Sequence, residues 1–350
     1  MMPAALGLST YRWNNNIKSM LLLLAFPFLL LGLLGGIFYM LGLVYANQPG
    51  ADGIISPYLF QNFHLASANG AYTPLDFAAA AIIQYWPIVT GVAVIWILIG
   101  YFFNDALIHA ATGAKPVTRT EAPQLYNILE NLCIARGLKT PNLYVIDTDE
   151  MNACASGIDQ KSYAITVTQG LLDRLDNKEM EAVLGHELTH IINRDCRLLI
   201  ITVVFVGMIS FLAQMVWRSM RFAVYSRDRR GGGAGLIMLI AGVMLLIGYF
   251  FALVLRFAIS RKREYLADAG SVELTKDPEA LISALRKIAD APEVPHVPPE
   301  VKQMFIENPP SAMDFFGLFA THPPIEERIH VLEELGGLPP EGHSLIPPSG

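Results

Sequence analysis

The chain has 350 residues, of which 53% are hydrophobic and 16% are charged, and its mean hydropathy is +0.40. This composition is too apolar for an ordinary soluble protein and favours a membrane protein, with the lipid bilayer as a partner. The formal net charge is -6, so the chain has no overall basic character, which argues against a nucleic-acid partner. The three cysteines have no C-x-x-C spacing and suit a reducing compartment.

The N-terminal third contains two apolar runs that predict transmembrane helices. Residues 1–19 are predicted to form a cytoplasmic N-terminus, and the runs at 20–46 and 77–103 are long enough to cross a bilayer and contain no Lys, Arg, Asp or Glu. The first run is too long for a signal peptide, so it is predicted to be a retained anchor. The loop at 47–76 also lacks Lys and Arg, which places the N-terminus inside.

Residues 104–197 are polar enough to begin a soluble domain. The pattern predicts a helix over Glu121–Arg136 and strands over Leu143–Asp147 and Tyr163–Thr168. Together with residues 260–350, this block predicts one α+β domain on the cytoplasmic side of the membrane.

The next predicted helix carries the residues with the clearest chemistry. Asp176 and Glu179 form a capping-box pattern that starts this helix. In His186-Glu187-Leu188-Thr189-His190 the two histidines are four residues apart, so both imidazoles can bind one metal ion while Glu187 flanks it as a general base. The apolar stripe that points away from the histidines consists of Met180, Leu184, Leu188, Ile191 and Ile192.

Two further apolar runs predict a hydrophobic helical hairpin over residues 198–259. Five arginines lie in the loop of this hairpin, which conflicts with a loop on the outer side of the membrane. Two alternatives remain: the hairpin spans the membrane despite this charge, or it does not cross. Both return the chain to the cytoplasmic side. Leu198 follows His190 by eight residues, so a helix that continued through both would hold the metal about 12 Å from the apolar run. The metal site is therefore expected at the cytoplasmic surface of the bilayer.

A catalytic zinc ion needs a third protein ligand and an open position for water. Glu264 lies just beyond the hairpin, and Asp268 follows it by one helical turn on the same face. Spacing alone leaves two alternatives open for Glu264, which are a metal ligand and a solvated acid that pairs with Lys262 or Arg263.

The block at 260–350 predicts two helices and an irregular region. Residues Arg261–Ala269 are expected to form the end of one helix, and Pro278–Ala289 are expected to form a second helix. Prolines are dense between 292 and 310, which predicts an irregular loop.

The histidine motif, with Glu264 and Asp268 in an E-x-x-x-D pattern, resembles the HtpX branch of the membrane-bound gluzincins, relatives of the CaaX-processing zinc proteases. The resemblance covers Asn152–Asp195, Ser260–Ala284 and Thr321–Arg328. It implies a multi-pass helical membrane protein with a zincin-like metalloprotease domain. One zinc ion would be bound by His186, His190 and Glu264, and Asp268 would orient a ligand imidazole. Protein quality control in a bacterial inner membrane is also implied, with the active site facing the cytoplasm.

Two more segments resemble motifs of this family. Asn152-Ala153-Cys154-Ala155 looks like its edge strand, to which a substrate backbone adds as an extra strand, although Cys154 replaces the usual aromatic residue. His322 and Arg328 look like the pair of its H-P motif, which approaches the zinc site. From the residues alone, His322 is an ordinary loop histidine and Arg328 a surface helix residue. Stabilisation of the oxyanion by His322 would be worth about 100- to 1,000-fold, and near-parent turnover of His322→Ala would contradict it.

The sequence thus predicts a zinc metalloendopeptidase that cleaves membrane or membrane-proximal proteins. A CaaX-type processing protease is an alternative, but that branch usually has more apolar runs. An intramembrane protease is disfavoured because charged residues surround the histidine motif. A membrane assembly or transport protein with structural zinc is also disfavoured, because a structural site needs no general base beside its ligands.

Overall fold

The computed structural model describes residues 8–45, 73–225, 242, 248, 262–289, 304–306 and 323–336. The chain forms two compact units. The first comprises residues 1–19, 101–203 and 256–350, and the second comprises residues 20–100 and 204–255.

The second unit is built from parts of three long apolar helices, whose remaining residues belong to the first unit. Helix α1 covers Leu8–Tyr45, α3 covers Pro74–Thr112, and α7 covers Asp195–Tyr225. Within the described part of the chain, two helical segments, Ile17–Met40 and Pro74–Thr112, are long and apolar enough to cross a membrane. The predicted spans at 20–46 and 77–103 fall largely on α1 and within α3 respectively.

Contacts inside the second unit join these helices. The rings of Phe26 and Phe205 stack with their centroids 4.0 Å apart, and Trp96 Nε1 donates a hydrogen bond of 2.9 Å to the carbonyl oxygen of Val204. Large apolar side chains such as Phe28 and Ile88 remain exposed, as expected of surfaces that face lipid. The first half of the predicted hairpin lies on α7, whereas nearly all of its second half lies outside the described residues.

The first unit contains a four-stranded sheet in the order β1-β2-β4-β3. The strands are β1 (Lys115–Pro116), β2 (Asn142–Ile146), β3 (Ala153–Ser156) and β4 (Ala164–Thr168). Strands β2 and β4 are parallel, while β1 with β2 and β3 with β4 are antiparallel. The two predicted strands are confirmed within one residue at each end, and β3 lies at an edge of the sheet.

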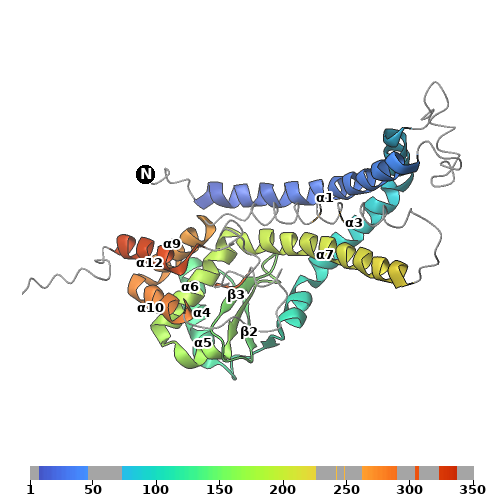
Figure 1. Cartoon of the computed structure of the whole chain (residues 1–350). Coiled ribbons are helices and arrows are strands. Elements are labelled where there is room, and N and C mark those ends of the chain that lie inside the picture. The colour runs from blue at the N-terminus through green and yellow to red at the C-terminus, as the bar shows by residue number, and fades with distance from the viewer. Residues whose placement is uncertain are drawn as a thin grey trace, which may run out of the picture. The chain divides into compact units, whose positions relative to one another are not determined.

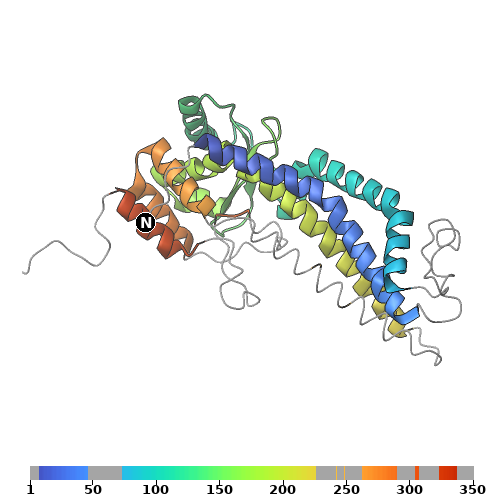
Figure 2. The same ribbon diagram turned by 90° about the horizontal axis from the view of Figure 1, so that it is seen from above.

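The shorter described helices belong to the first unit, together with the adjoining ends of α1, α3 and α7 (Figures 1 and 2). The shorter helices are α4 (Pro123–Arg136), α5 (Gln169–Arg174), α6 (Asn177–Asn193), α9 (Lys262–Thr275), α10 (Pro278–Ala289) and α12 (Ile325–Gly336). Helix α6 packs against the sheet through β3 and β4, and α9 and α10 pack against α6. The apolar stripe predicted on α6 lies in the hydrophobic core, with Met180, Leu184, Leu188 and Ile191 buried.

Helix α9 is longer than the sequence predicts. The expected end was Ala269, but the helix continues to Thr275 through Gly270. A Cβ atom built on Gly270 would lie 2.4 Å from Cγ2 of Thr189, so glycine here permits close packing of α9 on the histidine helix. The glycine is therefore a packing position within the helix rather than a stop signal.

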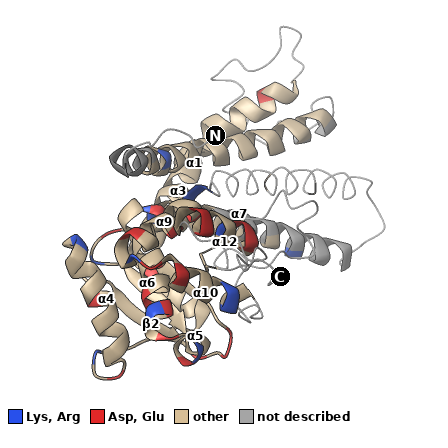
Figure 3. Ribbon diagram, turned by 90° about the vertical axis from the view of Figure 1, so that its left-hand side faces the viewer, with Lys and Arg blue, Asp and Glu red and all other residues tan. Residues whose placement is uncertain are grey.

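Charged residues are unevenly distributed along the chain (Figure 3). Most of the described length of α1 and α3 is uncharged, whereas Asp, Glu, Lys and Arg are frequent on α4, α6, α9, α10 and α12. The first unit therefore has the composition of a water-exposed domain, whereas α1 and α3 have that of membrane segments.

Candidate metal centre

The start of α6 is fixed by the predicted capping box. Asp176 Oδ1 accepts hydrogen bonds from the backbone N–H groups of Lys178 (2.8 Å) and Glu179 (2.9 Å), and Glu179 Oε2 accepts one from the backbone N–H of Asp176 (2.8 Å). The Glu179 carboxylate also pairs with Lys287 Nζ at 2.7 Å and accepts from Ser283 Oγ at 2.6 Å. The cap thus joins α6 to α10 and fixes the helix that carries the histidines.

Three side chains that the sequence identifies as potential metal ligands converge in the first unit. His186 Nε2 and His190 Nε2 are 3.2 Å apart, and Glu264 Oε2 is 3.7 Å from each of them. All three residues are buried, and their potential ligand atoms lie within 4.8 Å of one another. Two elements separated by a long stretch of sequence, α6 and α9, therefore supply one cluster.

These distances fit a zinc ion. Ligand atoms about 2.0–2.1 Å from a tetrahedral zinc are about 3.3 Å from one another, close to the separations of 3.2 and 3.7 Å seen here. Two imidazoles and one carboxylate are also a donor set that catalytic zinc sites use, with the fourth position left for water.

Both imidazoles are oriented by carboxylates on the side away from the cluster. Asp268 Oδ1 lies 2.9 Å from His186 Nδ1, and Asp195 Oδ2 lies 3.1 Å from His190 Nδ1. Burial by itself would lower the pKa of His190, but the carboxylates of Glu264 and Asp195 raise it to about 10. An Nδ1–H donated to a carboxylate leaves Nε2 as the metal-binding atom and makes the imidazole a stronger ligand.

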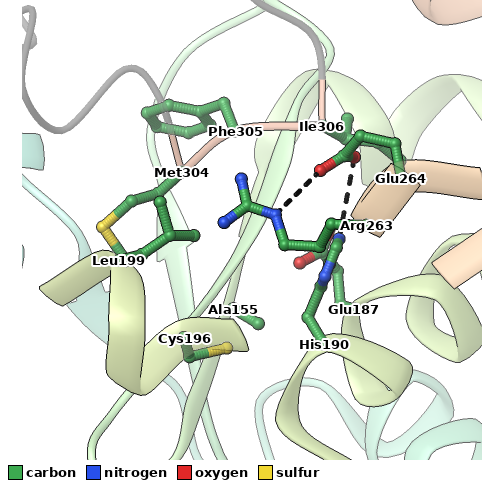
Figure 4. A pocket seen from close by; sticks show the side chains of 10 residues that line it. All are labelled: Ala155, Glu187, His190, Cys196, Leu199, Arg263, Glu264, Met304, Phe305 and Ile306. Carbon is green, nitrogen blue, oxygen red and sulfur yellow. Dashed lines mark hydrogen bonds and ion pairs between the residues drawn. The ribbon is translucent and has the colours of Figure 1, made fainter. Parts of the chain in front are cut away.

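Glu187 lies beside the cluster in a small cavity (Figure 4). The cavity is lined by Ala155, Glu187, His190, Cys196, Leu199, Arg263, Glu264, Met304, Phe305 and Ile306. Burial raises the pKa of Glu187, and among the described residues its Oε2 has no hydrogen-bond partner. A carboxylate with a raised pKa and an unengaged oxygen is suited to take up and return a proton.

The surroundings of Glu264 decide between the two alternatives that spacing left open. Glu264 is only 1% exposed, so the alternative that it is a solvated surface acid is wrong. The contact with Arg263 does exist, at 3.4 Å between Arg263 Nε and Glu264 Oε1, but Arg263 is itself 2% exposed and lies in the cavity. The sequence did not predict Arg263 as a site residue, because cationic residues at the end of an apolar segment usually lie at the membrane–water interface.

A helix break after the histidine motif was not predicted. Helix α6 ends at Asn193, Arg194 adopts a left-handed conformation with φ 61°, and α7 begins at Asp195. The prediction of one continuous helix from His190 to Leu198, on which the distance of about 12 Å from the metal to the apolar run depends, is therefore wrong. The break places the Asp195 carboxylate against His190. This contact of Asp195 with His190 was not predicted, although the sequence does place an acidic residue five positions after the second histidine.

Arg328 is part of the interior of the first unit. The sequence alone favoured a surface position, but Arg328 is 0% exposed. Its Nε and Nη2 donate to the two carboxylate oxygens of Asp268 at 2.9 and 2.7 Å, and its Nη1 donates to the carbonyl oxygen of Ile306 at 3.1 Å. Arg328 thus holds the acid that contacts His186. His322 lies outside the described residues.

The segment Asn152–Ala155 is placed next to the cluster, and part of it forms edge strand β3. Cys154 forms an isolated antiparallel bridge with Phe305, and the backbone N–H of Ile306 donates to the carbonyl oxygen of Ala153 at 2.9 Å. The outer edge of β3 is therefore already paired with a segment of the same chain.

The sequence model of peptidase family M48 matches residues 119–336, the stretch that contains this cluster. The chain belongs to peptidase family M48. A protease HtpX homologue of Bacteroides fragilis is 44% identical over 336 residues, covering 94% of this chain and 98% of that protein. An HtpX homologue of Dictyoglomus turgidum is 38% identical, covering 76% of this chain and 89% of that protein. The chain is therefore a membrane zinc protease of the HtpX type, and the CaaX-type and non-catalytic alternatives are disfavoured.

One solved structure is also similar, at a lower level. The crystal structure of Ste24p from S. mikatae has a TM-score of 0.44 and 20% sequence identity to the chain. The match covers 79% of this chain and 61% of that one, so the chain corresponds to about three fifths of Ste24p.

Proposed function

We propose that this M48 peptidase hydrolyses peptide bonds at one zinc ion held by His186, His190 and Glu264. The observation that supports this most directly is the convergence of their three ligand atoms within 4.8 Å, with Glu187 next in sequence to one of them. A bound zinc ion would polarise the scissile carbonyl and lower the pKa of its water towards about 7. Glu187 would accept the proton of that water and return it to the leaving amine.

The two acids behind the histidines would keep the site in order. Asp268 and Asp195 hold the Nδ1 atoms of His186 and His190, so both Nε2 atoms face the same point. In the proposed site they therefore orient ligands and do not touch the substrate. Arg328 would hold Asp268 in place through its bidentate hydrogen bonds to the carboxylate. His322 stays a predicted contributor to oxyanion stabilisation.

Substrate binding would use the edge of β3 at Asn152–Ala155. A peptide added there as a strand would form backbone hydrogen bonds beside Glu187 and be held for attack. The pairing of β3 with Phe305 and Ile306 would compete with it. A productive substrate would therefore displace this segment.

Phe305→Ala is expected to lower the KM for a peptide substrate roughly 2- to 10-fold at similar kcat. The reason is that Phe305 is 2% exposed, so the alanine variant loses side-chain burial that holds the competing segment on β3. A net weakening of that segment by about 0.5–1.4 kcal/mol strengthens substrate binding by this factor. Steady-state kinetics of the zinc-loaded protein measure the effect, with zinc content as the control. A raised KM would instead show that Phe305 contacts the substrate.

Membrane proteins are the proposed substrates, and the active site is proposed to face the cytoplasm. The support comes from the helices of the second unit and from α7, which starts two residues after the histidine helix ends. Equal cleavage of the same target segment in free and membrane-inserted form would argue against this preference.

Metal removal tests the proposed function as a whole. The purified full-length protein in lipid vesicles is expected to cleave a membrane-inserted substrate with one zinc ion per chain, to lose cleavage after treatment with a chelator, and to regain it with zinc. Zinc content by elemental analysis and cleavage by gel are the measurements. Undiminished cleavage by fully zinc-depleted protein would overturn the proposal.

A further inference from the structure

We propose that Asn15, in the N-terminal helix, is a positioning residue for the metal centre that acts through Asp195 on His190. The inference rests on the proposed zinc site and adds a residue to it from outside the stretch that matches the family model, which begins at residue 119. Asn15 belongs to the same compact unit as the metal centre, because residues 1–19 are part of the first unit.

A continuous chain of hydrogen bonds connects the residues. Asn15 Nδ2 donates to Asp195 Oδ1 at 2.8 Å and to the carbonyl oxygen of Asn193 at 3.1 Å. The other carboxylate oxygen of Asp195 lies 3.1 Å from His190 Nδ1. Asn15 is 3% exposed, and Asn193 and Asp195 are 0% exposed, so water does not compete for these contacts.

The side chain of Asn15 contacts the break between α6 and α7. The left-handed residue Arg194 separates α6 from α7, and the amide group of Asn15 binds a residue on each side of it. One contact satisfies a carbonyl at the end of α6, which has no partner within its own helix. The other fixes the rotamer of Asp195. Asn15 thus holds the turn in the geometry that directs Asp195 at His190.

The amide is chemically suited to this role. A neutral donor binds Asp195 Oδ1 without neutralising its charge, so the carboxylate still strengthens the imidazole ligand. A cation at this position would compete with His190 for that charge. Ser19 Oγ donates to the backbone carbonyl of Asn15 at 2.8 Å within α1, a contact that does not involve the side-chain amide.

Zinc affinity provides a test that does not depend on cleavage. In Asn15→Leu, which keeps the approximate shape but removes both donors, zinc should bind up to about 10-fold more weakly, the lower end of the range for groups that contact a ligand directly. Competition with a chromophoric chelator measures this in the full-length protein. The visible spectrum of the cobalt-substituted protein should also change, because the orientation of His190 is altered.

A double-mutant cycle shows whether Asn15 acts through Asp195. In the Asp195→Asn background, Asn15→Leu should weaken zinc binding by less than about twofold, because the contact between residue 195 and His190 is already altered. Ser19→Ala, a buried polar deletion on the same helix, should keep parent zinc affinity. Asn15→Ala also removes both donors and should weaken zinc binding to a similar extent, which provides the same test if the leucine variant does not fold.

Three results would overturn the proposal. They are an unchanged zinc affinity in Asn15→Leu, an equal loss in the parent and Asp195→Asn backgrounds, and an equal loss in Ser19→Ala. The parent protein is measured first, because failure of the parent to bind zinc would refute the zinc site itself, whereas normal zinc binding by Asn15→Leu refutes only the role of Asn15.

Discussion

Glu187→Gln is expected to lower peptide-bond cleavage about 100- to 10,000-fold, the range for loss of a general acid–base group. Glutamine has nearly the same shape as glutamate but does not accept a proton from water at neutral pH. Glu187 is not one of the three proposed ligands, so zinc should stay bound. The measurement compares the parent and the variant, both with one zinc ion per chain, on one membrane-protein substrate.

The matched control is Glu181→Gln, the same change on the same helix outside the metal cluster. It should retain parent cleavage, because Glu181 is only partly buried and does not line the cavity of Glu187. Parent-level cleavage by zinc-loaded Glu187→Gln would rule out Glu187 as the base. Loss of zinc together with cleavage would show instead that Glu187 helps to hold the metal.

Arg328→Met should destabilise the first unit by about 3–5 kcal/mol, the usual cost of removing one partner of a buried ion pair. The change leaves the Asp268 carboxylate buried without its guanidinium and removes a donor to the Ile306 carbonyl. Arg328 also lowers the pKa of Asp268, against the opposing effect of burial. Denaturant unfolding of the detergent-solubilised protein measures the loss, and a loss below about 1 kcal/mol would contradict it.

A second substitution separates stability from metal binding. In Arg328→Met with Asp268→Leu, both charges are replaced by apolar groups, so most of the lost stability should return. Zinc affinity should remain lowered, because the partner of His186 Nδ1 is gone. Recovery of stability and zinc affinity together would show that Asp268 does not orient His186.

Features that depend on local spacing could be predicted from the sequence. The four-residue separation of His186 and His190 places both on one helical face, and the capping box at Asp176 fixes where that helix starts. The predicted helix Pro278–Ala289 is confirmed at both ends. The predicted end of α9 was wrong, because the packing of Gly270 against Thr189 is not visible in local sequence.

The sequence by itself therefore determined the histidine helix, the apolar runs and the family, all of which follow from patterns within a few tens of residues. Only the tertiary structure decided that Arg328 is buried on Asp268, that Arg263 enters the cavity and that Asn15 reaches Asp195 across 180 positions. These contacts join segments far apart in the chain. They depend on how helices pack and where α6 breaks, and the left-handed conformation of Arg194, a non-glycine residue, is not specified by local propensity.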